Sequence, residues 1–343
     1  MFDKKPVAGV DSDILNESIW KVRWGLFKKG FKKNWSIFCE RKIGLIGIGI
    51  IVLFLLMTIA HPIWMRYLET QPVPAEQAIM YGGRNITLRD VYHPTRGNDF
   101  RIGEDMMPPS HPLPPSLSHP LGTDPMGRDI LSQIMYSTRI EFSFGVLSAL
   151  IGVIIATLVG TVAAYYGGKV DAFFMRFADL VMTFPFLPFL IFLSSMVTLD
   201  LFTLGIVIGL LSGFGGPSII LKSQALSVKI RPYIEAAEVS GGSPWHIMTK
   251  HIIPNILPLS FLYLMMGVTS AVMSEATLSF LGLLNADISW GIIMDMARTF
   301  GYSFYDAWWL YVAPGVTITL FCGAFYLVGR GMDPIINPKL RKR

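Results

Sequence analysis

Residues Glu235–Asn255 read EAAEVSGGSPWHIMTKHIIPN and lie between two apolar segments that are each long enough to cross a bilayer. Pro232, just before them, can begin a helix, because the first helical position needs no amide hydrogen. The Gly241-Gly242 pair permits the positive φ that ends such a helix, and Ser243-Pro244 can cap and begin a second one. The first helix would have about nine residues and a length of roughly 13 Å. Because a spanning helix needs about 20 residues, the stretch predicts a short helical pair held between two spans.

The first of these helices presents small and polar side chains. At i, i+3, i+4 and i+7 spacing, one face carries Tyr233, Ala236, Ala237 and Ser240. Glu235 and Glu238 lie beside that face. A helix of this kind is suited to close contact with a soluble partner, although an ordinary connection between spans is an equally simple interpretation. A DNA-binding helix-turn-helix is disfavoured, because the flanking spans leave it no freedom to enter a groove.

The composition is that of a polytopic membrane protein. Of the 343 residues, 52% are hydrophobic and 15% are charged, whereas soluble domains carry about 25% charged residues. The mean hydropathy is +0.49. We attribute the net charge of +5 to basic residues placed beside the spans, so no nucleic-acid partner is expected. Cys39 and Cys322 predict neither a disulfide framework nor a zinc site, and residues 1–42 show no cleavable signal peptide.

Six apolar segments are predicted to cross the bilayer. They are Ile43–Ala60, Phe142–Tyr166, Leu180–Val197, Leu201–Leu221, Ile256–Met273 and Ala307–Val328. By the positive-inside rule, the lysines and arginines of residues 1–42 and 331–343 place both termini in the cytoplasm. Residues 61–137, which are rich in proline, are then external. The histidines of this segment, His93, His111 and His119, match no metal-ligand spacing and are predicted to be loop residues.

Residues 1–42 form a predicted cytoplasmic arm, and its basic residues can be interpreted in two ways. Its basic residues either hold it at the anionic lipid surface or act only as a topology signal, which is the simpler interpretation. Aromatic residues recur in it at helical spacing, namely Trp20, Trp24, Phe27 and Phe31. This pattern indicates that part of the arm lies in the membrane interface as an amphipathic helix.

Three features of the spans bear on packing and on a transport path. Gly205, Gly209 and Gly213 fall at i, i+4 and i+8, a small-residue face that favours close helix packing. Pro185 and Pro188 interrupt the third span, where they are predicted to kink the helix and free backbone carbonyls. Glu275 lies at the end of an apolar span. It is either a functional intramembrane carboxylate or a helix-end residue that reaches the outer interface.

The quoted stretch resembles the EAA loop of bacterial ABC importer permeases. The resemblance lies in Glu235-Ala236-Ala237, in Gly241 six residues after the glutamate, and in His251–Asn255, which reads HIIPN. In that family the loop forms a coupling helix that sits in a groove of the ATPase subunit.

Two further motifs resemble the dipeptide/oligopeptide/nickel branch of these permeases. Leu121–Leu131 reads LGTDPMGRDIL and is similar to the LGTDxxGRD signature; we interpret it as a turn, with Asp129 capping the next helix. Ser274–Leu283 followed by Ser289–Gly291 is similar to the EAxLSFLGLG and SWG motifs. The chain departs from the branch at residues 284–288, which replace a longer proline-bearing connection, and at Ser137, where glycine is usual.

The resemblance implies an all-α polytopic fold of six transmembrane helices. Residues 43–60 would form the first helix and residues 138–330 the type I (MetI-like) permease core, with the coupling loop at 232–255. The coupling role carries over to Glu235, Ala236, Ala237, Ser240, Gly241, Gly242 and Ser243. The implied partners are a second homologous permease, two ABC ATPase subunits and an external solute-binding protein, assembled in the inner membrane of a bacterial or archaeal cell. ATP would then drive alternating access of the spans.

No active site is apparent in the sequence. It contains no HExxH, GxSxG or GxxxxGK[ST] motif, so ATP and Mg²⁺ would be bound by partner subunits and no cofactor by this chain. His246 and His251 are five residues apart, about 140° around an α-helix, and are not expected to share a metal-binding face. Pro185, Pro188 and Glu275 remain the pore or gate candidates.

Alternative functions follow from what the motifs leave open. The solute of such an importer is most simply a di- or oligopeptide, with oligosaccharides or nickel as alternatives within the same branch. An ion-driven secondary transporter is the more distant alternative. It would require paired carboxylates at the midplane and inverted repeats, neither of which is evident in the sequence, and it leaves the EAA-like loop unexplained.

Overall fold

The chain is described here by a computed structural model that covers residues 25, 28, 30, 32, 34–71, 87–95, 112–284 and 286–336. Within these residues the chain forms helices and turns and no β-strand, which confirms the predicted all-α class. The aromatic pattern of the N-terminal arm, His111 and the basic residues beyond 336 fall outside the described residues.

Four long helices are apolar enough to cross a membrane. They are α2 (Lys42–Glu69), α5 (Ile130–Tyr166), α12 (Ile253–Phe280), which continues from α11 (Pro244–Ile247) and the π-helix η1 (Met248–Ile252), and α14 (Trp309–Gly331), which runs on into α15 (Asp333–Ile336). Two bent pairs also qualify: α6 (Gly168–Thr183) with α7 (Phe186–Met196), bent by 78°, and α8 (Leu201–Phe214) with α9 (Gly216–Lys229), bent by 42°. The fold therefore holds four candidate spans, or up to six if each bent pair is one span.

The first two long helices extend beyond the predicted apolar segments. Helix α2 runs to Glu69 instead of ending at Ala60, and α5 begins at Ile130 instead of Phe142. Both extensions take residues from the predicted external segment 61–137. Hydropathy misses them because they are helices with only one packed face: His61 on α2 is buried against α5, where its Nε2 lies 3.4 Å from Ser132 Oγ.

The bent pairs correct the predicted third and fourth spans. Helix α6 begins at Gly168, well before Leu180, and the bend falls at Phe184-Pro185, with Pro185 as the N-cap of α7. Pro188 lies in the first turn of α7, where its missing amide hydrogen breaks no helical hydrogen bond, so only one of the two prolines accompanies a break. Gly215 divides α8 from α9 in the same way.

Helix α5 is the centre of the bundle and packs against α8, α9 and α12. The predicted glycine face is confirmed on its α8 side. A Cβ atom at Gly209 would lie 2.8 Å from Ser148 O, and one at Gly213 would lie 2.8 Å from Gly152 O. Between α5 and α12 the hydroxyls of Thr157 and Ser260 are 2.9 Å apart. Small residues therefore let the backbone of α8 approach that of α5 closely, as expected where close packing holds helices together.

Leucine at position 209 is expected to impair folding of the chain. The side chain would have to displace the α5 backbone at Ser148, and overpacking costs about 1–3 kcal/mol or more. We expect a lower yield of monodisperse protein and a lower melting temperature in detergent. Gly49→Leu is the matched control, because Gly49 lies in α2 with nothing within 4 Å of its Cβ position. If the two variants have equal yields and melting temperatures, position 209 tolerates a large side chain.

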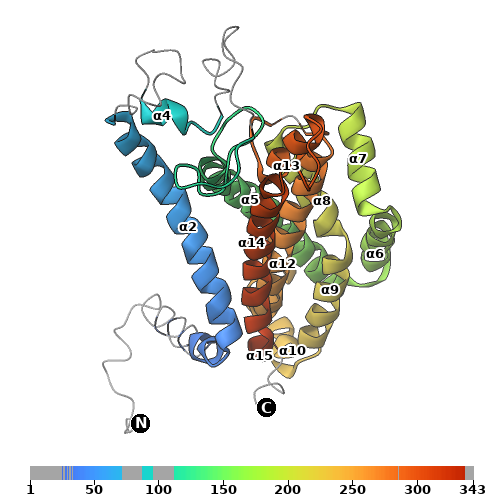
Figure 1. Cartoon of the computed structure of the whole chain (residues 1–343). Coiled ribbons are helices and arrows are strands. Elements are labelled where there is room, and N and C mark those ends of the chain that lie inside the picture. The colour runs from blue at the N-terminus through green and yellow to red at the C-terminus, as the bar shows by residue number, and fades with distance from the viewer. Residues whose placement is uncertain are drawn as a thin grey trace, which may run out of the picture.

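The two ends of the bundle are different (Figure 1). The short helices α10 (Pro232–Val239) and α15 lie at one end, and α4 (Leu88–Val91) and α13 (Trp290–Thr299) lie at the other. The start of α2 lies at the α10 end, because Gly44 packs against Gly331 at the end of α14. Toward the α13 end, an aromatic cluster joins α2, α13 and α14, with Phe54, Trp290 and Phe321 in mutual ring contact.

Candidate functional site

The segment between α9 and α12 folds as the pair of short helices that the sequence predicts. Helix α10 begins with Pro232 at its first position, and α11 begins with Pro244 after an N-cap at Ser243, whose Oγ accepts from the His246 N–H at 3.3 Å. Gly241 has a φ of +80°. The predicted starts, turn and cap are therefore confirmed.

The two glycines of the turn have different roles. The Gly241 N–H donates to Glu238 O at 2.9 Å and the Gly242 N–H donates to Ala237 O at 3.0 Å, which satisfies the carbonyls at the end of α10. Nothing lies within 4 Å of the Cβ position of Gly241, so glycine is needed there for its backbone conformation alone. At Gly242 a Cβ would lie 2.8 Å from Ala237 O, so glycine is needed there for space.

Two buried isoleucines fix the helical pair to the bundle, and a lysine joins the two longer helices beside it. Ile234 of α10 and Ile247 of α11 are 1% and 0% exposed and belong to a cluster with Ala164 of α5 and Val228 of α9. Lys229 Nζ donates to Tyr165 O at 2.6 Å, at the end of α5. A cation is stabilised by the free carbonyls of a helix C-terminus. Sequence reasoning missed these anchors, although one isoleucine inside each polar helix is a detectable signal.

The exposed surface of the pair differs in part from the prediction. Glu235, Ala236 and Ser240 are exposed, but Ala237 is half-buried and packs against the cluster around Ile234. The prediction of one free face that includes Ala237 was wrong, because Ala237 lies three residues after the buried Ile234 and packs on the same side of the helix. Large apolar side chains are exposed instead. These are Ile230, just before α10, at 83%, Val239 at 85% and Trp245 at 62%.

The π-helix changes the relation between the two histidines. His246 and His251 were expected on different faces of an α-helix, but their ring centroids are 5.9 Å apart. Residues five apart come into register where hydrogen bonds run from i to i+5, and Met248–Ile252 form such a turn. Among the described residues no group of three or more His, Cys, Asp or Glu could hold a metal ion.

The pore candidates do not form one site. Pro185 lines an open groove of about 660 Å³ between α5, the α6–α7 bend, α8 and α12. Gly152, Met182, Tyr263, Gly267 and Ser270 are among its other lining residues. Pro188 is not among them, and Glu275 lies elsewhere, fully buried near the end of α12. Of the two interpretations of Glu275, its full burial contradicts the one in which it is a helix-end residue that reaches the outer interface.

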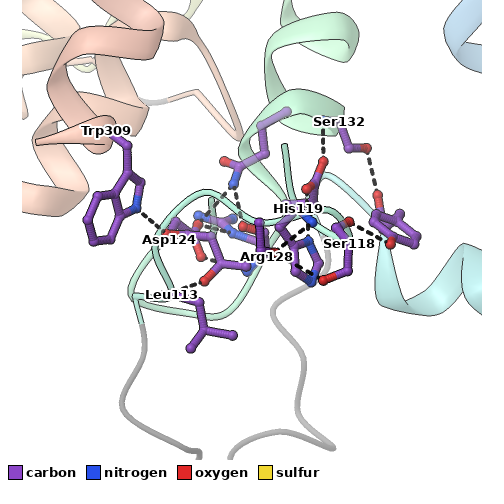
Figure 2. A network of polar contacts seen from close by, with 12 residues as sticks. Leu113, Ser118, His119, Asp124, Arg128, Ser132 and Trp309 are labelled. Carbon is purple, nitrogen blue, oxygen red and sulfur yellow. Dashed lines mark hydrogen bonds and ion pairs between the residues drawn. The ribbon is translucent and has the colours of Figure 1, made fainter. Parts of the chain in front are cut away.

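The LGTDPMGRD motif forms a buried polar network at the start of α5 (Figure 2). Asp124 accepts from the Arg128 amide at 2.7 Å, from Arg128 Nε at 2.6 Å and from Gln133 Nε2 at 3.1 Å. Asp129 caps α5 by accepting from the Ser132 N–H at 2.8 Å, as predicted, and it also pairs with His119 Nδ1 at 2.9 Å. His119 is therefore buried, which corrects its prediction as a loop residue in solvent.

The same loop is joined to the far side of the bundle. Trp309, at the start of α14, donates from Nε1 to Thr123 O at 3.1 Å (Figure 2). Asp124 and Asp129 are both 0% exposed. The motif therefore fastens the chain that precedes α5 to α5 and α14, and it leaves these carboxylates no access to a solute.

Comparisons with known proteins agree with this architecture. The family model described as "Binding-protein-dependent transport system inner membrane component" matches residues 132–342. The chain is 30% identical to the oligopeptide transport system permease protein OppC of Bacillus subtilis, over 98% of this chain and 97% of that protein. It is 36% identical to OppC of Haemophilus influenzae over 65% of this chain and 71% of that protein.

A further relative is the dipeptide transport system permease protein DppC of Bacillus subtilis, 33% identical over 67% of this chain and 72% of that protein. The family match covers the short helical pair, the groove and the Glu275 region together. The chain therefore belongs to the family of binding-protein-dependent transport system inner membrane components.

Proposed function

We propose that this importer permease subunit carries di- or oligopeptides and is driven through α10 by ATPase subunits. The solute rests on the relatives, whose names refer to dipeptide and oligopeptide transport. Each bent pair, α6–α7 and α8–α9, would be one span, so that the chain crosses the inner membrane six times. Its termini and α10 would then face the cytoplasm.

The observation that carries the coupling role is the way in which α10 is held. Its inner side is fixed by Ile234 and Ala237, which pack in the buried cluster, whereas Glu235, Val239 and Trp245 of the helical pair project outward. A rigid element with an exposed aromatic and apolar surface has the properties of an interface anchor. Movement of a partner bound there would be passed to α5, α9 and α12 without bending the short helix. Two ABC ATPase subunits, which would bind ATP and Mg²⁺, are the partners we infer.

The groove beside Pro185 is the part of the chain best suited to line a solute path. Of the described residues that line it, none is His, Cys, Asp or Glu. Small and apolar side chains with backbone carbonyls accommodate varied peptide side chains, whereas nickel would require soft or charged ligands. We infer that a second homologous permease closes this open groove and that a solute-binding protein delivers peptide at the α13 end.

Uptake into right-side-out membrane vesicles tests which solute is transported. The transporter is supplied with ATP in the lumen and with its binding protein outside, and labelled dipeptides, longer peptides, an oligosaccharide and Ni²⁺ are offered separately. We expect ATP-dependent uptake of peptides only. Uptake of Ni²⁺ or oligosaccharide, with no peptide uptake, would reassign the solute but leave the importer class intact.

The proposed orientation predicts which positions an impermeant thiol reagent can reach. In a variant lacking Cys39 and Cys322, Leu117→Cys should be labelled on intact cells, because this side chain is fully exposed in the segment before α5. Lys169→Cys, exposed at the start of α6, should be labelled only after permeabilisation. The opposite pattern would invert the topology.

A further inference from the structure

Two carboxyl groups that are far apart in the sequence meet inside the bundle. Glu141 of α5 and Glu275 of α12 are both 0% exposed. They are neighbours across a close contact of the two helices: a Cβ atom at Gly145, one turn after Glu141, would lie 2.9 Å from Cγ2 of Val272, one turn before Glu275. Ser279 Oγ donates to Glu275 Oε1 at 2.6 Å. Sequence reasoning singled out Glu275 and missed Glu141, so the paired carboxylates that it did not find are present in the fold.

Three of the four carboxyl oxygens find no hydrogen-bond donor among the described residues. They are both oxygens of Glu141 and Oε2 of Glu275. An ionised carboxylate only accepts hydrogen bonds, so two of them facing each other repel and leave each other unsatisfied. A proton on one carboxyl turns the same contact into a hydrogen bond. Buried like charges are relieved in this way when no cation neutralises them.

The groups that surround the pair include no neutralising cation within the described part of the chain. From α14 the titratable neighbour is Cys322, and from α2 the aromatic ring of Phe54 packs on Trp290 and Phe321 instead. The nearest arginines, just before and within α5, do not neutralise the pair, because Arg128 pairs with Asp124 and Arg139 is exposed.

The start of α13 supplies donors for one negative charge. The Ser289 hydroxyl, which accepts from the Ile292 N–H at 3.2 Å, and the Trp290 backbone N–H are neighbours of the two carboxyl groups. Free amides at a helix N-terminus favour an anion. Gly291 allows this approach, since a Cβ there would lie 2.5 Å from Ala276 O. Together with Ser279, these groups do not satisfy two carboxylates, since three of the four carboxyl oxygens remain without a hydrogen bond in the described part of the chain.

We propose that Glu141 and Glu275 bind one proton between them, forming a carboxylic acid–carboxylate pair that fastens α5 to α12 and to the start of α13. The site is a proton site and not a metal site, because no group of three or more possible ligand side chains occurs among the described residues. This inference is independent of the proposed solute and of the coupling role of α10.

Infrared spectroscopy of the purified transporter in nanodiscs tests the proposal. A protonated carboxylic acid has a carbonyl stretch above the amide I band, and this stretch shifts in D₂O. Difference spectra at neutral pH compare the wild type with Glu141→Gln and with Glu275→Gln. In each variant the glutamine amide can donate to the remaining carboxylate, so the fold is preserved. The control is Glu69→Gln, which removes an exposed carboxylate paired with Arg89.

One shared proton predicts that either substitution alone removes the whole band attributed to the pair, and that the control changes nothing in this region. A band that is halved in each variant would show two protons, and absence of the band from the wild type would show two carboxylates. Both results overturn the proposal. So does a wild-type band that falls when Na⁺ replaces a bulky organic cation at constant pH, since the site would then bind a metal cation. The wild-type spectra in H₂O and D₂O decide the first question even if a variant fails to fold.

Discussion

Gly241→Val is expected to abolish peptide-stimulated ATP hydrolysis by the assembled transporter while the spans remain inserted. Gly241 has a φ of +80° with open space around its Cβ position, so the substitution acts through the backbone alone. A β-branched residue held in that region is strained by about 1–3 kcal/mol. Relief of the strain would rotate α10 away from its anchored position, and the exposed Glu235 and Val239 would no longer present one surface. Stimulated turnover and the amount of co-purified ATPase are the measurements.

The chain offers a matched control for that experiment. Gly301 has a φ of +76° and is likewise without neighbours within 4 Å of its Cβ position, but it follows α13 at the other end of the bundle. Gly301→Val should impose similar strain and retain the ATPase subunits. Glu235→Ala, which removes an exposed carboxylate from the first turn of α10, should weaken retention without straining the chain. If Gly241→Val and Glu235→Ala both bind ATPase fully and turn over normally, α10 is an ordinary connection.

Asp124→Ala is expected to cause the largest loss of stability of any single substitution considered. Arg128 would remain buried, at 4% exposure, without the carboxylate that accepts from its backbone and side chain. Removing one member of a buried ion pair costs about 3–5 kcal/mol. The loss would appear as a lower melting temperature of the purified transporter in detergent.

Two further variants make the stability measurement specific. Asp124→Asn keeps an acceptor for the Arg128 amide but removes the charge, and it should give an intermediate melting temperature. Asp306→Ala removes an exposed aspartate that accepts from the nearby Ser303, and should change the melting temperature much less. If the Asp124→Ala and Asp306→Ala variants have the same melting temperature, the network around Asp124 does not stabilise the fold.

Local rules made the short helices predictable. Pro232, Gly241 and Ser243 each suit one position of a helix start, a left-handed turn or a cap, so their order specified α10, the turn and α11 before any packing was known. Asp129 was predictable as a cap for the same reason. The glycine face of α8 was also visible, because small residues at i, i+4 and i+8 have few other uses in a span.

Tertiary packing decided what the sequence could not show. Hydropathy located the apolar part of α2 and α5 but not their polar extensions, which are helical because one face is covered. Ile234 inside a polar helix gave the direction of α10, and it was passed over in favour of its small neighbours. The meeting of Glu141 with Glu275 depends on the contact between α5 and α12, which no local pattern encodes.

Cross-linking from Val239 tests most directly whether α10 contacts the ATPase subunits. Val239→Cys, in a variant lacking Cys39 and Cys322, places a reactive thiol at the end of α10, where the side chain is 85% exposed in the isolated chain. A short bifunctional thiol reagent applied to native membranes should join this chain to an ATPase subunit, and ATP should change the yield. Leu117→Cys, at the opposite end, should give no such product. Failure of Val239→Cys to cross-link an ATPase subunit, while exposed positions elsewhere on the chain do so, would contradict the coupling role of α10.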